Sequence, residues 1–397
     1  MDIEEGFLST KLKLKHHYYR LFSFFIGFAF VFLGAVFLSA DVQWVLQSPL
    51  DYQVFQRQSR GAGDVLIKGH VKSEDAEGGV LQYRLVKDSM VDWQNFPADL
   101  ENGIFENTVP VPSGGWYRLD LRVIKEDLPI SEHVITHVGV GELFVVAGQS
   151  NAANHGEERM QTHTELVSTF DGSHWQLAND PQPGASGNRG SFLPSFGDEM
   201  VRRFQVPIGF VSCGIGATSV REWLPEDSRF PNPPTLIGRV EQLPNGEWSS
   251  KGEAYRIFVE RMRSLRDSRF RAVLWHQGES DANQKDSTRT LSGNLYRNYL
   301  ENIIRSSRAA IGWEVPWFVA QVSYHVPGDE SSPDIRGAQA SLWKDGIVFQ
   351  GPDSDAIKGH YRERQGKGVH FSAEGLEEHA RRWAEKVGPW LEAELAQ

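Results

Sequence analysis

The sequence has very little cysteine, which limits the chemistry that the chain can support. Cys213 is the single cysteine among 397 residues, so no disulfide can form within the chain and no cysteine cluster can bind a metal ion. A lone cysteine in an apolar segment is more often a core residue than a reactive thiol. The histidines are scattered and lack the spacing of metal ligands. We therefore expect that the protein requires no metal.

The sequence also lacks an excess of positive charge and the common nucleotide motifs. The formal net charge of −11 gives no general attraction to nucleic acid or to anionic membranes. No G-x-G-x-x-G motif follows a strand-like segment, and no G-x-x-x-x-G-K-[ST] motif occurs. We therefore expect no nucleic-acid partner and no nucleotide or other cofactor.

One long hydrophobic run stands near the amino terminus. Residues 21–40 are uncharged and apolar over about the length that crosses a bilayer. Basic residues precede this run, at Lys11, Lys13, Lys15 and Arg20. The segment 38–40 resembles a cleavage site, although the run is longer than the usual apolar part of a signal peptide. Residues 1–40 are thus expected to be a signal peptide or an uncleaved anchor helix, with the rest of the chain exported and the membrane contacted through this helix only.

Residues 41–138 have the pattern of a small all-β domain. Short segments alternate apolar with polar residues, and Gly, Asp, Asn and Pro separate them, which is typical of an antiparallel β-sandwich. The clearest segments are 65–67, 81–85, 116–123 and 133–135. No cluster of titratable groups occurs among them. This domain is predicted to serve a structural role or to be a weak sugar-binding accessory.

From residue 139 to the carboxyl terminus, strand-like and helix-like segments alternate. Strands are predicted at 143–147, 208–212, 272–275, 317–322 and 347–349. Helices are predicted at 254–265, at 295–308 and from about residue 372 onward. This alternation predicts an α/β domain over 139–397: a doubly wound parallel sheet in three layers with right-handed crossovers.

A serine follows the first predicted strand of this domain. Ser150 comes two residues after Gly148, at the strand end where open α/β sheets bind ligands. It is a candidate nucleophile if a base and an oxyanion hole can reach it. The alternative is a turn serine that caps the next helix. The local pattern differs from the G-x-S-x-G elbow, because Ala152 replaces the second glycine.

Three further strand ends carry polar chemistry. The segment 213–219 is a glycine-rich turn that can present a backbone N–H to an oxyanion. The segment 275–281 combines an amide donor with two carboxylates. His370 stands at the entrance of the last helix, where the helix dipole favours a neutral imidazole and therefore a working base. Taken together, the four segments supply a nucleophile, oxyanion donors, acids and a base.

These segments resemble the SGNH hydrolases. The motifs are Gly148-Gln149-Ser150-Asn151, the turn 214–219 followed by Trp223, His276-Gln277-Gly278-Glu279-Ser280 and Val369-His370-Phe371-Ser372. They are most similar to the sialate O-acetylesterase and acetylxylan-esterase-like branch, over residues 139–397. The resemblance implies the flavodoxin-like SGNH fold and an acetylated sugar or polysaccharide as substrate.

The resemblance also assigns roles to residues. It implies that Ser150 is the nucleophile and His370 the general base. It further implies an oxyanion hole formed by the N–H groups of Ser150 and Gly216 with the side chain of Gln277. In two-step acyl transfer, Ser150 would attack an acetyl carbonyl, the sugar would leave, and water would release acetate.

The acid that orients His370 departs from the family pattern. Many SGNH enzymes place an aspartate three residues before the histidine, but here that position is Lys367. A cation cannot accept the imidazole N–H. The related enzymes suggest Glu279 instead, with Asp281 as the next candidate. Other possibilities are Asp353 or Asp355, a Ser–His pair oriented by a backbone carbonyl, and an inactive member of the family.

Three functions remain open from the sequence. The first is a serine esterase that removes O-acetyl groups from sialic acid or an acetylated polysaccharide. The second is an SGNH hydrolase of other esters, and the third is a catalytically dead surface protein that binds carbohydrate. Trp223 and Trp275 are predicted either to stack on a sugar ring or to pack in the core.

Overall fold

The computed structural model describes residues 42–72, 74–89, 91–265 and 269–396. The predicted apolar helix at 21–40 lies outside these ranges. Within them, no helix has both the length and the apolar character that crossing a membrane requires.

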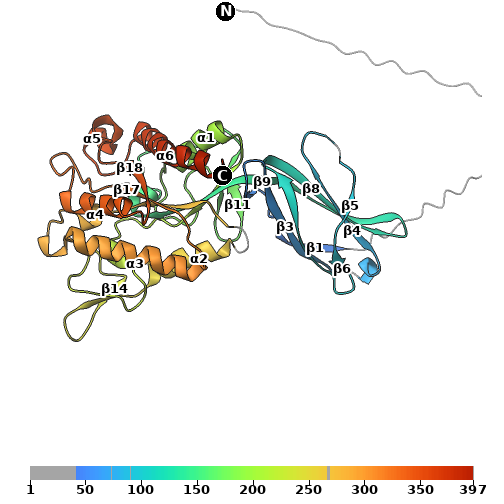
Figure 1. The fold of residues 1–397 in the computed structure, drawn as a ribbon, viewed down its shortest axis with the longest axis horizontal. Coiled ribbons are helices and arrows are strands. Elements are labelled where there is room, and N and C mark those ends of the chain that lie inside the picture. The colour runs from blue at the N-terminus through green and yellow to red at the C-terminus, as the bar shows by residue number, and fades with distance from the viewer. Residues whose placement is uncertain (1–41, 73, 90, 266–268, 397) are drawn as a thin grey trace, which may run out of the picture. The chain divides into compact units, whose positions relative to one another are not determined.

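The first part of the described chain is all β and consists of two sheets (Figure 1). One sheet is antiparallel, with the order β1 (Gln43–Ser48), β3 (Ala62–Lys72), β7 (Ile104–Pro112), β6 (Ala98–Asp99). The other contains β2 (Gln53–Gln56), β4 (Val80–Val86), β5 (Gln94–Asn95), β8 (Gly114–Lys125) and β9 (Leu128–Gly148). Each predicted segment of residues 41–138 lies in one of these strands.

Alternation along the strands builds the core of this part. In β3, Val65 and Ile67 are buried while Asp64 is exposed. In β8, Leu119 and Leu121 are fully buried and pack in the same cluster as the apolar residues of β3. The period of two therefore places one apolar face of each sheet against the other.

Strand β9 runs from the first sheets into the α/β part without interruption. Its first section pairs antiparallel with β8, and residues 138–141 pair in parallel with β2. Beyond that point it pairs in parallel on both sides, so that Phe144 lies opposite Phe210 on one neighbour and Ala272 on the other. The boundary predicted between residues 138 and 139 lies inside this strand.

The α/β part is built on parallel strands, and the mixed α/β prediction is confirmed. The strand order is β11 (Trp175–Leu177), β10 (Val167–Phe170), β12 (Ile208–Ser212), β9, β16 (Ala272–His276), β17 (Trp317–Gln321), β18 (Phe349–Asp353). All these neighbours are parallel except β11, which is antiparallel to β10. Because the chain passes to β12 on one side of β9 and to β16 on the other, the carboxyl end of β9 is a topological switch point.

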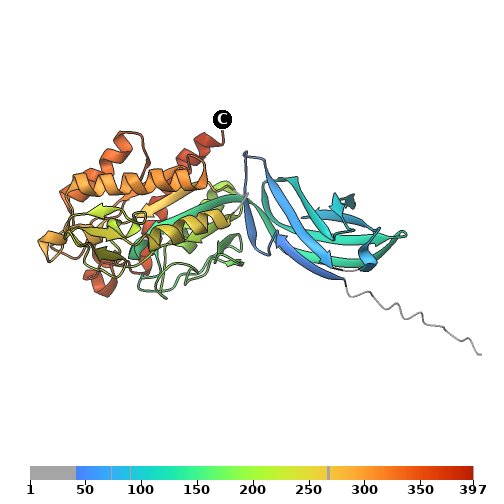
Figure 2. The same ribbon diagram turned by 90° about the horizontal axis from the view of Figure 1, so that it is seen from below.

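Helices cover both faces of this sheet (Figures 1 and 2). Residues of α1 (Leu193–Phe204) and α6 (Ala373–Glu394) share one core cluster with Phe144 and Val146 of β9. Residues of α2 (Glu253–Ser264), α3 (Gly293–Ile311) and α4 (Pro333–Lys344) share the other cluster with Val145 and Ala147. The alternating side chains of β9 thus anchor both helical layers. A separate small sheet has the order β13 (Arg229–Phe230), β15 (Trp248–Ser250), β14 (Val240–Gln242).

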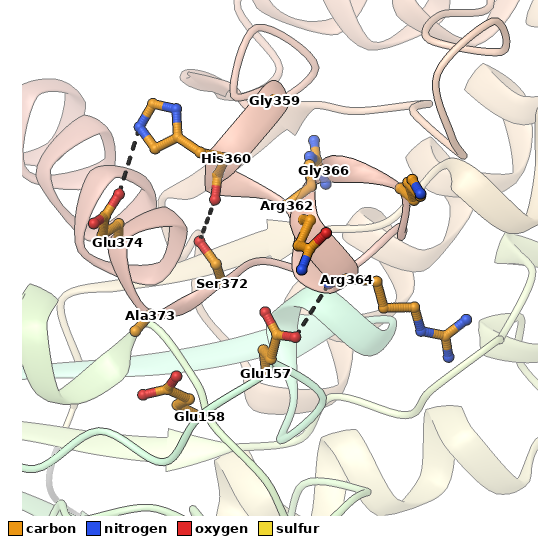
Figure 3. Close-up of a pocket in the computed structure, with 12 residues that line it drawn as sticks. Glu157, Glu158, Gly359, His360, Arg362, Arg364, Gly366, Ser372, Ala373 and Glu374 are labelled. Carbon is orange, nitrogen blue, oxygen red and sulfur yellow. Dashed lines mark hydrogen bonds and ion pairs between the residues drawn. The ribbon is translucent and has the colours of Figure 1, made fainter.

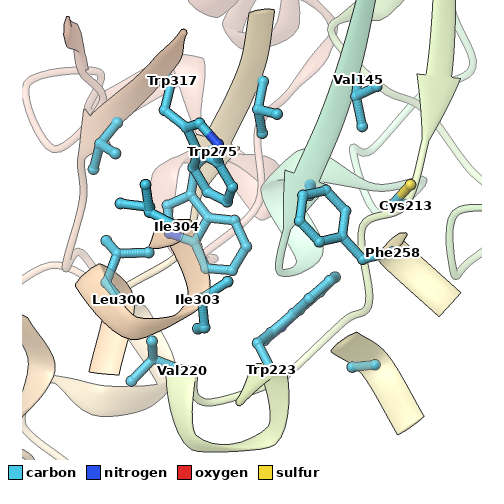
Figure 4. Close-up of a cluster of buried hydrophobic side chains, with 14 of the residues drawn as sticks. Val145, Cys213, Val220, Trp223, Phe258, Trp275, Leu300, Ile303, Ile304 and Trp317 are labelled. Carbon is cyan, nitrogen blue, oxygen red and sulfur yellow. The ribbon is translucent and has the colours of Figure 1, made fainter. Parts of the chain in front are cut away.

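Tryptophans fill the core behind the carboxyl end of β16 (Figure 4). Trp223 and Trp275 are fully buried, and their rings meet edge to face with centroids 5.2 Å apart. The core alternative for both residues is therefore confirmed. Cys213 lies in the same cluster, where burial raises the pKa of its thiol to about 12, so the prediction of a core cysteine is confirmed as well.

Candidate active site

A sharp turn at the end of β9 carries Ser150. Gly148 has a φ of +130°, and a Cβ atom there would lie 2.0 Å from the carbonyl oxygen of His276, so only glycine fits. The next N–H, of Gln149, donates to that same carbonyl at 2.9 Å. Ser150 then begins a single 3₁₀ turn, η2 (Ser150–Ala152). Among the described residues, neither the hydroxyl nor the N–H of Ser150 has a hydrogen-bond partner, so both remain available to a ligand.

His370 lies at the end of a loop that closes on itself. Arg362 and Phe371 form an antiparallel bridge at the base of the loop, and the N–H of Glu363 donates to the carbonyl of His370 at 2.8 Å. This closure places Oε1 of Glu363 2.9 Å from Nδ1 of His370. The Glu363 carboxylate is 4% exposed, so water does not compete for it. A carboxylate on Nδ1 fixes the ring and leaves Nε2 free to act as a base.

The structure corrects the acid that was expected to orient His370. Glu279 contacts the turn that carries Ser150 instead, where its Oε1 accepts a hydrogen bond from Nδ2 of Asn151 at 3.0 Å. Asp281 lies deeper, and its carboxylate accepts from the Ser219 hydroxyl at 2.5 Å and from the amide of Gln277 at 2.7 Å. Both carboxylates come directly after β16, whereas the loop of His370 supplies its own acid.

The two outlying candidates are also occupied elsewhere. Asp353 and Asp355 both accept hydrogen bonds from the guanidinium of Arg336, at 2.9 and 2.8 Å from its Nη1. Asp355 additionally accepts from the N–H groups of Ser323 and Tyr324. These carboxylates therefore order the loops after β17 and β18.

Sequence reasoning missed Glu363 because it lies seven residues before His370. The exposed Lys367 does occupy the position three residues before the histidine. In the short helical turn α5 (Glu363–Gly366), Arg364 and Gln365 both have left-handed backbone angles, with φ of 54° and 58°. These angles turn the chain back so that Glu363 faces His370. A left-handed pair of non-glycine residues has no sequence signature that could have revealed this contact.

The environment of His370 favours the neutral ring. Burial lowers the pKa of His370 from its ordinary value, and the Glu363 carboxylate acts in the opposite direction. Arg189 and Arg362 also lower the pKa of His370, by charge repulsion. The net direction is downward, so the imidazole is unprotonated and can accept a proton at neutral pH.

Ser150 and His370 line the same pocket, which has a volume of about 1020 Å³. A hydrogen bond of 3.3 Å from Nδ2 of Asn151 to the carbonyl of Val369 joins the two loops. It links the residue after Ser150 to the residue before His370. No hydrogen bond between the Ser150 hydroxyl and the His370 ring is formed among the described residues, and such bonds often tighten only when substrate is present.

The expected oxyanion donors differ in their availability. The N–H of Gly216 faces the pocket but donates to Oγ of Ser186 at 2.6 Å. Gln277 is fully buried below the pocket, and its amide donates to Asp281 and to the carbonyl of Thr218. The structure therefore corrects the role expected for Gln277: it braces the loops after β12 and β16 and does not line the pocket.

The rest of the pocket lining combines basic, acidic and apolar side chains. Arg239, Lys285 and His325 contribute to it, together with Asn283 and Asp329. Two partly exposed apolar side chains, those of Leu236 and Val326, also line it. No phenylalanine, tyrosine or tryptophan occurs among the described residues that line this pocket. A sugar here would be held by hydrogen bonds and charge more than by stacking on an aromatic ring.

A separate cavity of about 960 Å³ lies on the turn that carries Glu363 (Figure 3). Acidic and basic side chains mix along it, including Glu157, Arg364 and Glu374. Its one serine, Ser372, donates its hydroxyl to the carbonyl of His360 at 2.8 Å and caps α6. The cavity therefore offers no nucleophile beside a base.

The pocket with Ser150 thus combines an available hydroxyl, a neutral imidazole backed by a carboxylate, and an unpaired N–H. This set can perform nucleophilic attack on an ester and stabilise the resulting oxyanion. In the described ranges, no group of three or more His, Cys, Asp or Glu side chains could hold a metal ion.

Comparison with known families matches the part of the chain that contains Ser150 and His370. The sequence model of the family described as carbohydrate esterase, sialic acid-specific acetylesterase, matches residues 140–388. Among curated proteins, none matches the chain.

Solved structures are similar at low sequence identity. A carbohydrate acetylesterase from Xanthomonas citri aligns with a TM-score of 0.50 and 18% identity, over 86% of this chain and 74% of its own. NanS aligns with a TM-score of 0.43 and 15% identity, over 63% of this chain and 98% of its own. A protein from Arabidopsis thaliana aligns with a TM-score of 0.42 and 19% identity, over 62% and 96% of the two chains. At this identity, the likeness to the Xanthomonas citri enzyme concerns the fold alone.

Proposed function

Because the chain belongs to the carbohydrate esterase, sialic acid-specific acetylesterase family, we propose that Ser150, His370 and Glu363 form the catalytic triad with which it removes O-acetyl groups from carbohydrates. The observation that carries this assignment is the 2.9 Å contact of Glu363 with Nδ1 of His370, in a loop that shares one pocket with Ser150. Fixing Nδ1 in this way directs Nε2 toward a nucleophile.

The reaction proceeds by two acyl transfers. His370 takes the proton of the Ser150 hydroxyl as its oxygen attacks the acetyl carbonyl, and the Ser150 N–H donates to the developing oxyanion. The imidazolium, paired with Glu363, then returns the proton to the sugar oxygen, and the alcohol leaves. Water activated by His370 attacks the acetyl-serine, which releases acetate and restores Ser150.

Acetylated sialic acid is the sugar that we propose, with an acetylated polysaccharide as the alternative. Sialic acid carries a carboxylate, and Arg239 and Lys285 on the pocket wall are suitable partners for it. Leu236 and Val326, 44% and 41% exposed, offer apolar contacts to acetyl methyl groups.

Three further proposals concern the rest of the chain. The position of β9 between β12 and β16 supports the flavodoxin-like, doubly wound form of the SGNH fold. The apolar run 21–40 supports export, either on a membrane anchor or after cleavage. We assign the β-sandwich a structural role.

The test is acetate release by the full chain from a panel of acetylated sialic acids and acetylated polysaccharides, with long-chain esters for comparison. We expect Ser150→Ala to lower the rate at least about 10⁴-fold. Ser280→Ala is the matched control, because Ser280 lines the same pocket, and it should keep most of the activity. A rate unaffected by Ser150→Ala would exclude the mechanism, and faster turnover of long-chain esters would exclude the carbohydrate as the main substrate.

A further inference from the structure

A second hydroxyl–imidazole pair lies beside the proposed catalytic one. Oγ of Ser186 is 3.2 Å from Nε2 of His155, and both residues line the pocket that contains Ser150. The His155 ring is stacked on the His370 ring, with centroids 5.4 Å apart and an angle of 27° between the planes. The mechanism derived above does not use this pair.

The hydroxyl of Ser186 accepts the hydrogen bond of the Gly216 N–H, which is the expected oxyanion donor. It accepts the N–H of Gly216 at 2.6 Å, which is the position that a substrate oxygen must take to use the same N–H. The backbone of Ser186 is fixed, because its N–H donates to the carbonyl of Gly214 at 2.8 Å and its carbonyl accepts from Asn154 at 2.9 Å. Only rotation of the side chain can release the donor.

His155 gives the displaced hydroxyl a partner. Burial lowers the pKa of His155, and the neighbouring His370 lowers it further, so the ring is neutral and Nε2 can accept a proton. The Ser186 hydroxyl can therefore keep its hydrogen bond to His155 when it releases Gly216. Without this alternative, the half-buried Ser186 hydroxyl would lose a hydrogen bond when it releases Gly216.

We propose that Ser186 and His155 form a latch on the oxyanion hole: Ser186 holds the Gly216 N–H until the charged oxygen of the transition state displaces it, and His155 retains the released hydroxyl. This inference rests on the proposed function, because it takes Gly216 as an oxyanion donor. An oxyanion is a much stronger acceptor than a hydroxyl, whereas a neutral ester carbonyl is not. The latch therefore makes the Gly216 hydrogen bond available mainly in the transition state, which favours catalysis over substrate binding.

Substitutions at Ser186 and His155 should have opposite effects on kcat/KM. Ser186→Ala removes the competing acceptor, so KM for an acetylated sugar should fall and kcat/KM should rise about two- to tenfold, the factor expected for one hydrogen bond. His155→Phe keeps a ring against His370 but removes the partner of the displaced hydroxyl, so kcat and kcat/KM should fall by a similar factor while KM stays near its wild-type value. Ser186→Thr restores a hydroxyl and should restore the wild-type KM.

A double variant separates the latch from a merely structural role. In the Ser186→Ala background, His155→Phe should have no further effect on kcat/KM, because it acts through the missing hydroxyl. An equal effect of His155→Phe in both backgrounds, or a decrease in kcat/KM on Ser186→Ala, would overturn the latch. If the wild type and Ser150→Ala release acetate at the same rate, the result would instead count against the proposed function.

A measurement without substrate tests the resting contact. The amide proton of Gly216 should resonate at a lower field in the wild type and in Ser186→Thr than in Ser186→Ala, because only the first two variants hold it with a hydroxyl. This comparison needs no catalytic activity. The same chemical shift in wild type and Ser186→Ala would show that the hydroxyl does not hold Gly216 and would overturn the proposal.

Discussion

Glu363 acts on the imidazole of His370, so its replacement should change both the rate and the pH dependence. Glu363→Gln keeps the shape of the side chain but loses the charge that stabilises the imidazolium, and we expect kcat to fall roughly 10²–10⁴-fold. The carboxylate raises the pKa of His370. Its loss should therefore move the acidic limb of the kcat/KM profile to lower pH, which a pH series of acetate release would measure.

Glu279→Gln is the matched control for this prediction. Glu279 also lines the pocket, but its carboxylate contacts Asn151 and not His370. A glutamine oxygen can accept the same hydrogen bond, so the variant should keep a much larger share of kcat than Glu363→Gln does. The reverse ranking of the two variants would identify Glu279 as the orienting acid.

Glu279 itself should make stability depend on pH. Burial raises the pKa of Glu279 to about 7, from an ordinary value of 4.5. Between these values the unfolded chain releases its proton while the folded protein keeps it, so the wild type loses stability as pH rises through this window. The glutamine of Glu279→Gln cannot ionise. The free energy of unfolding of this variant should therefore increase relative to that of the wild type, by up to about 3 kcal/mol between pH 4.5 and pH 7. Urea denaturation at both pH values measures this, and a constant difference would contradict it.

Individual residues differ in how far the sequence reveals them. Ser150 and His370 stand at strand and helix ends, where topology directs chemistry, so the alternation of elements was sufficient to place both in one pocket. Gln277 and Glu279 sit in an equally suggestive motif, but a 3₁₀ turn, η4 (Glu279–Asp281), decides which of its side chains face the pocket. The contact of Glu363 with His370 depends on left-handed backbone angles at Arg364 and Gln365, and these residue types do not indicate such angles.

At the scale of elements, the turn α5 maintains the contact between Glu363 and His370 at a conformational cost. The exposed Gln365 adopts left-handed angles of φ 58° and ψ 42°, which cost a non-glycine residue about 1–2 kcal/mol. Gln365→Gly removes this cost but adds the entropy that glycine loses on folding, about 0.5–1 kcal/mol. We therefore expect the free energy of unfolding to rise by about 0.5–1 kcal/mol, as measured by urea denaturation.

Lys367→Gly provides the contrast in the same loop. Lys367 is also exposed, but its φ of −100° lies in the region that any residue adopts. Glycine gains nothing there and should destabilise the protein by about 0.5–1 kcal/mol. Equal effects of the two substitutions would show that the left-handed angles at Gln365 store no strain.

Elements with a clear apolar period were predictable, and others were not. Helices α2, α3 and α6 show their buried stripes in the sequence and were expected close to their observed bounds. Helix α1 has Pro194 as its second residue and contains Gly197, and α4 begins with Pro333, so the local sequence of each is typical of a turn. Strand β10 is only four residues long and gains its stability from pairing with β12, which no local pattern reports.

At the scale of the whole molecule, a buried carboxylate joins the two parts of the described chain. Glu142 on β9 is fully buried and accepts from Nε of Arg57 and from Nε of Arg271, both at 2.6 Å. Arg57 follows β2, and Arg271 precedes β16. Replacing one partner of such a group leaves part of its charge uncompensated.

We therefore expect residues 42–396 to unfold in one transition and Arg57→Met to lower its free energy of unfolding by about 3 kcal/mol. Calorimetry and tryptophan fluorescence should report the same midpoint. Arg60→Met is the control, since Arg60 is exposed and its loss should change stability by less than about 0.5 kcal/mol. Two separate transitions, with Arg57→Met shifting only one, would show that the β-sandwich unfolds independently.

The unbroken course of β9 also restricts how this architecture can vary in length. Phe144 and Val146 serve one helical layer, while Val145 and Ala147 serve the other. One inserted residue upstream would exchange these two sets and rotate Ser150 away from its base. Natural or engineered variants can therefore add or remove residues at this junction only in pairs, unlike proteins whose domains are joined by a flexible tether.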